Sequence, residues 1–304
     1  MKMEQPETKY TTEWFRDRAF TTIHKLDAHS WDYSDSLLLY ISSGVEQYET
    51  LQKEDTPYFA LVTKPEREYL QSIAKEVIQS LPSKFEFIDL GPGTEHKEQF
   101  FFDEIKKLGK ECEYVPVDIS DHYLKLAEEH ANAQGIKVNP LKASFEELPS
   151  VLGESSIPRF VTIGLTFSNY EPQIILDLLK KIAGKSGFVF INAQMRDRTD
   201  MASLQKVYAE DAVTLADGKL KLIGLDPNKD VTPRQTNDGF QVWCSLINQN
   251  KDTESIGMLP GDKILVFQSL RYTPEQLTKE LNSASGKYQM FDTGSSFIAT
   301  LLRV

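Results

Sequence analysis

The sequence Phe85-Glu86-Phe87-Ile88-Asp89-Leu90-Gly91-Pro92-Gly93-Thr94 joins an apolar run to two closely spaced glycines. The run has the length of a buried parallel strand, and the glycines end it. Glycine lets a backbone approach a ligand closely, and open α/β sheets bind ligands beyond the carboxyl ends of their strands. This stretch therefore predicts a central strand that leads into a ligand-binding turn at Gly91 and Gly93.

The turn differs from loops that bind nucleotide phosphates. Glu95-His96 replaces the end of a G-x-G-x-x-G pattern, and no G-K-[ST] follows. The next predicted strand ends in Asp118, about 25 residues after the glycines, where a carboxylate can accept both hydroxyls of a ribose. Asp89 and Glu95 disfavour a pyrophosphate. A cofactor with a ribose, no phosphate and a cationic sulfonium fits, so we predict S-adenosylmethionine. The alternative is a strand turn followed by a solvated acid.

Strand and helix patterns alternate after residue 85, which is typical of a doubly wound parallel α/β sheet. The expected strands lie near residues 85–90, 113–118, 138–142, 159–165 and 186–193, and the expected helices at 97–108, 121–134 and 172–183. Residues 11–83 have amphipathic helical patterns, with a break near 56–59 and a helix start at Lys64-Pro65.

The alternation ends after Met195. The pattern there predicts a helix near 199–212 and then a turn-rich segment. Two antiparallel strands are expected at 240–247 and 263–272, followed by a helix from Pro274 and a final strand pair that includes Phe291 and residues 297–302.

The composition excludes several classes of function. The 304 residues carry a formal net charge of −11, which argues against non-specific binding to nucleic acid or to anionic membranes. No apolar run is long enough to span a membrane, and residues 1–5 are polar, so we expect a soluble, cytoplasmic protein. Cys112 and Cys244 lie too far apart for a C-x-x-C pair. The sequence makes no prediction about oligomeric state.

Metal and hydrolase motifs are not found. The five histidines have neither H-E-x-x-H spacing nor a partner C-x-x-C pair, so we predict no metal site. They are His24, His29, His96, His122 and His130. The chain also has no G-x-S-x-G nucleophile turn, which argues against a hydrolase.

Other polar and aromatic residues are candidates for ligand contacts. Asn169 follows the fourth predicted strand and lies at the same sheet edge as Gly91; its amide can donate and accept without adding charge, and the alternative is a capping role. Lys97 stands in the first turn of a helix, where it serves either a ligand carboxylate or the solvated surface. Four tyrosines outside the sheet module can position a neutral amine or simply pack: Tyr40, Tyr48, Tyr58 and Tyr208.

Several motifs resemble the ergothioneine-pathway histidine Nα-methyltransferases and their relatives, which include fungal N-methyltransferases of a prenylated tryptophan. Residues 89–97 are similar to that family's D/E-L-G-S-G-T-x-x-K loop, and residues 114–120 to its Y-V-P-x-D-V-S strand end. Weaker similarities extend over residues 30–304, at 40–49, 162–169, 204–208 and 269–272.

The resemblance implies a fold and a set of contacts. It implies a Rossmann-like class I methyltransferase sheet over 60–196, which binds S-adenosylmethionine, and a second α+β substrate domain from 1–59 and 197–304. Gly91, Gly93, Lys97 and Asp118 would bind the cofactor, with Ser144 and Phe145 near its adenine. The acceptor contacts implied are an amino-acid head group held by Asn169 and Tyr208, and an amine pocket lined by Tyr40 and Tyr48.

The chain departs from the family pattern at two substrate positions. Residues 57–64, which include Tyr58, replace Y-Y-P-T-R, and Val266-Phe267-Gln268-Ser269 replaces T-E-I-S. Phe267 cannot accept a hydrogen bond from an imidazole, whereas a glutamate can. We therefore expect an S-adenosylmethionine-dependent N-methyltransferase, without metal, for a small amine or amino acid other than histidine. The alternatives are an O-methyltransferase of a small metabolite and a degenerate protein that only binds the cofactor.

Overall fold

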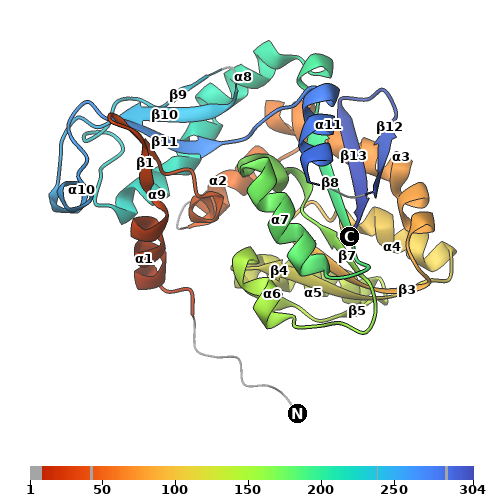
Figure 1. The fold of residues 1–304 in the computed structure, drawn as a ribbon. Helices are drawn as coiled ribbons and strands as arrows, with labels where there is room; N and C mark the ends of the chain where they lie inside the picture. The colour runs from red at the N-terminus through yellow and green to blue at the C-terminus, as the bar shows by residue number, and fades with distance from the viewer. Residues whose placement is uncertain (1–8, 42–43, 238, 285–286) are drawn as a thin grey trace. The chain divides into compact units, whose positions relative to one another are not determined.

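The computed structural model describes residues 9–41, 44–237, 239–284 and 287–304 (Figure 1). The chain divides into two units. One contains the described residues up to Leu51 together with Gln205–Leu270, and the other contains Gln52–Leu204 and Arg271–Val304.

An eight-stranded mixed sheet forms the centre of the second unit, with the order β12-β13-β8-β7-β3-β4-β5 and with β6 also beside β4. The pairs among β3, β4, β5, β6, β7 and β8 are parallel, as the alternating pattern predicts. The strands are β3 (Lys84–Leu90), β4 (Glu111–Asp118), β5 (Lys137–Val138), β6 (Leu141–Lys142), β7 (Arg159–Thr162), β8 (Phe188–Gln194), β12 (Lys287–Asp292) and β13 (Phe297–Arg303).

Two predicted strands differ in length from the observed ones. The strand expected at 138–142 is split into β5 and β6, because Pro140 has no N–H to donate to the ladder. The strand expected at 159–165 ends at Thr162. Gly164 then has a φ of 54°, which turns the chain into the 3₁₀ helix Gly164–Asn169.

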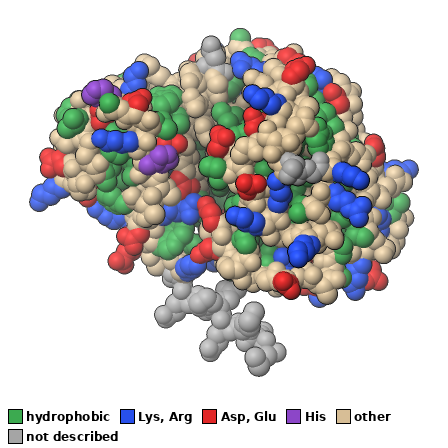
Figure 2. Space-filling view, in the orientation of Figure 1, with side chains coloured by type: hydrophobic (Ala, Val, Ile, Leu, Met, Phe, Trp, Pro, Cys, Tyr) green, Lys and Arg blue, Asp and Glu red, His purple; other side chains and the backbone are tan. Residues whose placement is uncertain are grey.

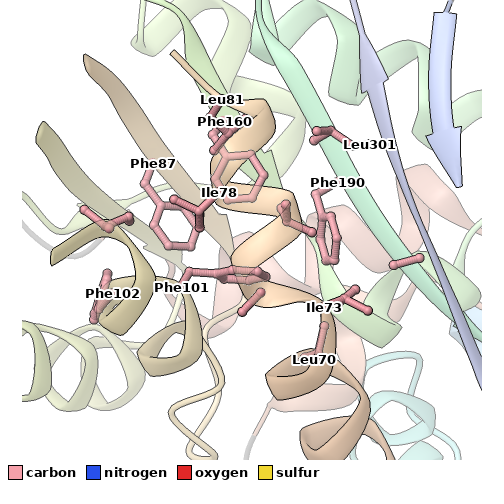
Figure 3. Packing of buried hydrophobic residues seen from close by; sticks show 14 of the residues in the cluster. Leu70, Ile73, Ile78, Leu81, Phe87, Phe101, Phe102, Phe160, Phe190 and Leu301 are labelled. Atoms are coloured by element: carbon pink, nitrogen blue, oxygen red, sulfur yellow. The ribbon is translucent and has the colours of Figure 1, made fainter. Parts of the chain in front are cut away.

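Helices α3, α4 and α5 bury an aromatic core against one face of this sheet (Figure 3). Phe87 of β3 lies at its centre, with its ring centroid 5.0–5.9 Å from those of Phe101, Phe102, Tyr114 and Phe160. On the other side, α7 packs on β7 and β8. The helices of this unit are α3 (Lys64–Ser80), α4 (Glu98–Lys107), α5 (Asp121–Ala133), α6 (Leu148–Val151), α7 (Pro172–Ala183) and α11 (Pro274–Ser283).

The helix start predicted at Lys64 is confirmed, but the break before it is not a loop. Residues Phe59–Thr63 form a π-helical turn that runs directly into α3. The turn buries Val62 and Thr63, so the segment stays helical while its hydrogen-bond pattern changes.

The C-terminal strand pair belongs to the large sheet, which corrects the predicted division of the chain. The prediction grouped residues 197–304, but 271–304 lie in the second unit. The physical reason is strand pairing: β13 pairs antiparallel with β8 along its whole length, from Phe297 opposite Gln194 to Arg303 opposite Phe188. Burial of Phe297, Ile298 and Ala299 then fixes this strand in the core.

The first unit is built on a smaller sheet with the order β1-β2-β11-β10-β9. The predicted antiparallel pair is confirmed as β10 and β11. The strands are β1 (His24–Asp27), β2 (Ser30–Asp32), β9 (Gln235–Thr236), β10 (Gln241–Ser245) and β11 (Lys263–Gln268). The helices are α1 (Thr12–Thr22), α2 (Gly44–Leu51), α9 (Asp217–Leu222) and α10 (Lys251–Ile256), with 3₁₀ helices at Ser36–Tyr40 and Ala212–Ala216. Helix α8 (Met201–Glu210) crosses the boundary between the units.

The hairpin of β1 and β2 shows that the helical prediction for this segment is wrong. β2 pairs in parallel with β11, far along the chain, and the buried Trp31 Nε1 donates to Asp262 Oδ2 at 2.9 Å. Contacts of this range override a short local pattern. Helix α10, also missed, begins at an Asn250 cap whose side chain accepts from the amides of Asp252 and Thr253.

The surface carries charges of both signs. On the face drawn in Figure 2, acidic and basic side chains are interspersed. Among the described residues, no helix combines the length and the apolar composition that crossing a bilayer requires.

Candidate functional site

Three neighbouring strands of the large sheet end at a common edge, where the predicted cofactor residues lie. Gly91 and Gly93 follow β3 with φ angles of 70° and 65°, a region that side chains disfavour. A Cβ on Gly91 would lie 3.7 Å from Phe145 Cζ and 3.8 Å from Thr166 Oγ1. On Gly93 it would lie 2.8 Å from Glu95 Oε2. The turn is therefore bare backbone enclosed by loops from other strands.

Asp118 ends the adjacent strand β4, as predicted. Its Oδ1 accepts the amide of Ser120 at 2.8 Å. Burial raises the pKa of Asp118 to about 7, although hydrogen bonds from the amides of Ser120 and Ile119 act in the opposite direction. The carboxylate is thus held at the sheet edge in an environment where it titrates near neutral pH.

Ser144 and Phe145 lie beyond the strand that pairs next to β4. Ser144 is buried and caps the 3₁₀ helix Phe145–Glu147, and its amide donates to Glu147 Oε2 at 3.2 Å. This cap fixes the backbone so that the ring of Phe145 points toward Gly91. The structure therefore brings Phe145 to the glycine turn, while Ser144 sets its position.

Lys97 is not a solvated surface lysine, because a buried carboxylate holds it. It precedes α4, and its Nζ lies 2.9 Å from Glu66 Oε2 and 3.9 Å from Glu95 Oε2. Asn192 donates to the other oxygen of Glu66 at 2.8 Å. Burial opposes the charge on Lys97, but the two carboxylates outweigh it and raise the pKa of the amine. No local signal points to Glu66 or Asn192, because α3 and β8 supply them from distant parts of the chain.

Asp89, at the end of β3, binds protein groups. Its Oδ1 accepts from Thr162 Oγ1 at 2.6 Å, and its Oδ2 accepts from the Tyr114 hydroxyl at 2.8 Å. Burial, with a further contribution from Glu98, raises the pKa of Asp89 to about 6. These two bonds join β3 to β4 and β7 at the edge that carries the glycine turn.

Asn169 is the last residue of the 3₁₀ helix that follows β7, and it is half-buried. Tyr58, which precedes the π-helical turn, is mostly buried and lies in the large-sheet unit, as Asn169 does. The segment Gly164–Asn169 also contains Thr166, which lies close to Gly91. The loop after β7 thus reaches the same sheet edge as the glycine turn.

The remaining predicted acceptor residues form two groups in the first unit. The Tyr208 hydroxyl donates to Ser269 Oγ at 3.1 Å, and its ring stacks on that of Phe267 with centroids 6.2 Å apart and planes 6° from parallel. Tyr40 and Tyr48 form a separate edge-to-face pair at 5.4 Å. Tyr208, Phe267 and Ser269 are therefore neighbours in the folded chain.

His96 and His130 lie side by side, although their sequence spacing matches no metal motif. Their rings stack with centroids 4.2 Å apart. Glu98 lies beside both, with its Oε1 3.5 Å from His96 Nδ1 and 3.9 Å from His130 Nε2. The three residues come from different places: α5 supplies His130, α4 begins with Glu98, and the segment before α4 supplies His96.

The raised pKa of Asp118 predicts a pH-dependent effect of removing its charge. A carboxyl group whose pKa is higher in the folded state contributes stability that is present below its unfolded pKa and is lost as the pH rises through the folded value of about 7. We expect the unfolding free energy of Asp118→Asn, relative to wild type, to increase from about pH 5 to about pH 8 when measured by chemical denaturation. Asp121→Asn, at an exposed acid, is the control. An equal difference at both pH values would contradict the burial of this charge.

Comparison with known proteins identifies the family. The family model described as "Histidine-specific methyltransferase, SAM-dependent" matches residues 22–223, more than half of the chain. No curated protein matches the sequence.

Solved structures that match the chain at low sequence identity include methyltransferases. The CMeT domain of citrinin polyketide synthase is 12% identical over 78% of this chain and 52% of that chain, with a TM-score of 0.47. An S-adenosylmethionine-dependent methyltransferase from Clostridium acetobutylicum is 14% identical over 79% of this chain and 91% of that chain, with a TM-score of 0.40. The chain thus spans about half the length of the citrinin synthase chain that it matches.

The parallel order of β8, β7, β3 and β4 in the large sheet is that of the predicted Rossmann-like fold. The family match covers the glycine turn, the acid at the end of β4 and the loop after β7, which meet at one edge of the large sheet. The chain therefore belongs to the S-adenosylmethionine-dependent, histidine-specific methyltransferase family.

Proposed function

We propose that this protein transfers a methyl group from S-adenosylmethionine to the nitrogen of an amino acid or related small amine other than histidine. The unit with the large sheet binds the cofactor. The observation that carries the proposal is the sheet edge where the bare turn at Gly91 and Gly93 adjoins the carboxylate of Asp118.

The chemistry of this edge fits the cofactor. The ionised carboxylate of Asp118 accepts hydrogen bonds from the ribose hydroxyls. The protein backbone at Gly91 carries no side chain, so the cofactor can approach it closely. Phe145, whose ring points toward Gly91, offers an aromatic face to the adenine. Ser144 keeps that ring in place through its cap. Because Asp118 must be ionised for this role, binding weakens as the pH falls through about 7.

Lys97 serves the amino-acid end of the cofactor. Its ammonium has three donors, and Glu66 accepts one of them in the structure. The remaining donors are suited to a ligand carboxylate, and the ion pair with Glu66 keeps the amine charged and positioned. Lys97 therefore acts as a binding residue that Glu66 orients.

The proposed acceptor residues favour a methyl acceptor other than histidine. Methyl transfer needs a neutral nitrogen in line with the departing sulfur and shielded from water, and S-adenosylmethionine supplies the activated methyl group. Asn169 and Tyr208 hold the acceptor head group, and Tyr40, Tyr48 and Tyr58 supply further aromatic surface. Phe267 lies parallel to Tyr208 and offers an apolar face without a hydrogen-bond acceptor, which disfavours imidazole.

Removing the carboxylate of Asp118 tests the cofactor assignment. We expect Asp118→Ala to weaken S-adenosylmethionine binding by about 3 kcal/mol, or about a hundredfold in Kd, because two hydrogen bonds to a charged group are lost. Isothermal titration calorimetry with S-adenosylmethionine and S-adenosylhomocysteine measures the change.

Asp121→Ala provides the matched control, since Asp121 is an exposed acid three residues further along that pairs with Lys142. Its cofactor affinity should equal that of wild type. Equal affinities of the Asp118 and Asp121 variants would rule out the ribose assignment.

Phe267→Glu tests the basis of acceptor selection. The new carboxylate can accept an imidazole hydrogen bond, so we expect histidine binding to increase by at least about tenfold relative to wild type, the worth of one hydrogen bond to a charged group. Competition calorimetry in the presence of S-adenosylhomocysteine measures this affinity.

Phe267→Leu is the control, because it changes the ring without adding an acceptor. Both variants must retain cofactor affinity, which shows that they are folded. If the two variants bind histidine equally well, Phe267 does not determine the choice of acceptor.

A further inference from the structure

We propose that His96, Glu98 and His130 form a binding site for a divalent transition-metal ion such as Zn²⁺. All three residues lie in the unit with the large sheet. None of them is among the residues proposed to contact the cofactor or the acceptor, so the site is a separate one.

The distances between the donor atoms fit one ion. Nitrogen and oxygen ligands lie about 2.0–2.2 Å from zinc, so two donors on the same ion stand no more than about 4.2 Å apart. Glu98 Oε1 is 3.5 Å from His96 Nδ1 and 3.9 Å from His130 Nε2, both within that limit. All three donor atoms lie within 4.8 Å of one another. His96 is the more exposed of the two rings, at 36%, and can turn toward the point between Glu98 and His130.

The burial of the donor atoms provides an independent reason to expect a cation. The Glu98 side chain is only 2% exposed. In the described part of the chain, its Oε1 and His130 Nε2 are both buried and neither has a hydrogen-bond partner. Buried polar atoms without partners are rare in native proteins, because each leaves a desolvated group uncompensated. A metal ion bound between Glu98 Oε1 and His130 Nε2 would give each of these atoms a partner.

The surrounding charges leave the site favourable to a cation. Two nearby acids, Glu95 and Asp103, contribute negative charge at the histidines. Two nearby bases, Arg67 and Lys106, contribute positive charge. These four charges balance, so Glu98 gives the cluster a net negative charge.

The position of the cluster suggests what the ion would do. His96 stands in the segment after the glycine turn with a φ of 49°, Glu98 begins α4, and His130 lies near the end of α5. An ion held by the three would join the start of α4 to the end of α5. It would therefore act as a structural clamp that stabilises the folded state by its binding energy.

Metal titration tests the proposal. After treatment with EDTA and its removal, the wild-type protein should bind one equivalent of Zn²⁺ by calorimetry, and Co²⁺ should give the visible absorption of a bound, low-symmetry ion. We expect Glu98→Gln and His130→Gln each to lower the Zn²⁺ affinity by at least about tenfold, because a ligand matters at least as much as the groups that orient it.

His122→Gln is the matched control, because it removes a histidine from the exposed part of the same helix α5. Its metal affinity should equal that of wild type. His96→Ala, at a half-exposed position, gives the same test if a substitution at the buried Glu98 prevents folding. The proposal is overturned if wild type binds no Zn²⁺, which would assign the cluster to a protonated His96 paired with Glu98. It is equally overturned if the ligand variants bind as tightly as the His122 variant.

Discussion

The carboxylate of Asp89 holds the carboxyl ends of three neighbouring strands together. One oxygen accepts from Thr162 of β7 and the other from Tyr114 of β4, while Asp89 itself is the penultimate residue of β3. Because the glycine turn begins two residues later, these bonds determine where Gly91 stands relative to Asp118. The aromatic core beneath supports the same strands, since Phe87 contacts Tyr114 and Phe160. The cofactor edge therefore depends on a buried acid whose hydrogen-bonding capacity is used by the protein.

A second buried acid organises the residues that follow the turn. Glu66 of α3 accepts from Lys97 and from Asn192 of β8, and so links a helix, the loop and a strand through one carboxylate. A buried ion pair of this kind favours precise positioning more than stability, because desolvation offsets much of its attraction. Lys97 is thereby kept charged and in place for a ligand carboxylate.

The parallel core was predictable because its signals are local. Strands β3, β4 and β8 are apolar runs, and helices such as α7 have continuous apolar faces and a proline start, so both patterns are readable in a single segment. The hairpin of β1 and β2 was not predictable, because it depends on pairing with β11 more than two hundred residues later. The place of β13 beside β8 has the same cause. At the site, Gly91 and Asp118 belong to a spaced motif, whereas the partners Glu66 and Lys97, and the cluster of His96, Glu98 and His130, come together only through the fold.

The proposed acceptor specificity depends on Phe267. Its ring stacks on Tyr208, whose hydroxyl donates to Ser269, and it stands where the resemblance implies an acid that binds histidine. The most direct test is methyl transfer from isotopically labelled S-adenosylmethionine to a panel of amino acids and small amines that includes histidine, read by mass spectrometry. The account predicts a labelled N-methyl product from an acceptor other than histidine, with S-adenosylhomocysteine formed in equal amount. Histidine as the preferred acceptor, or transfer to none of the panel, would contradict it.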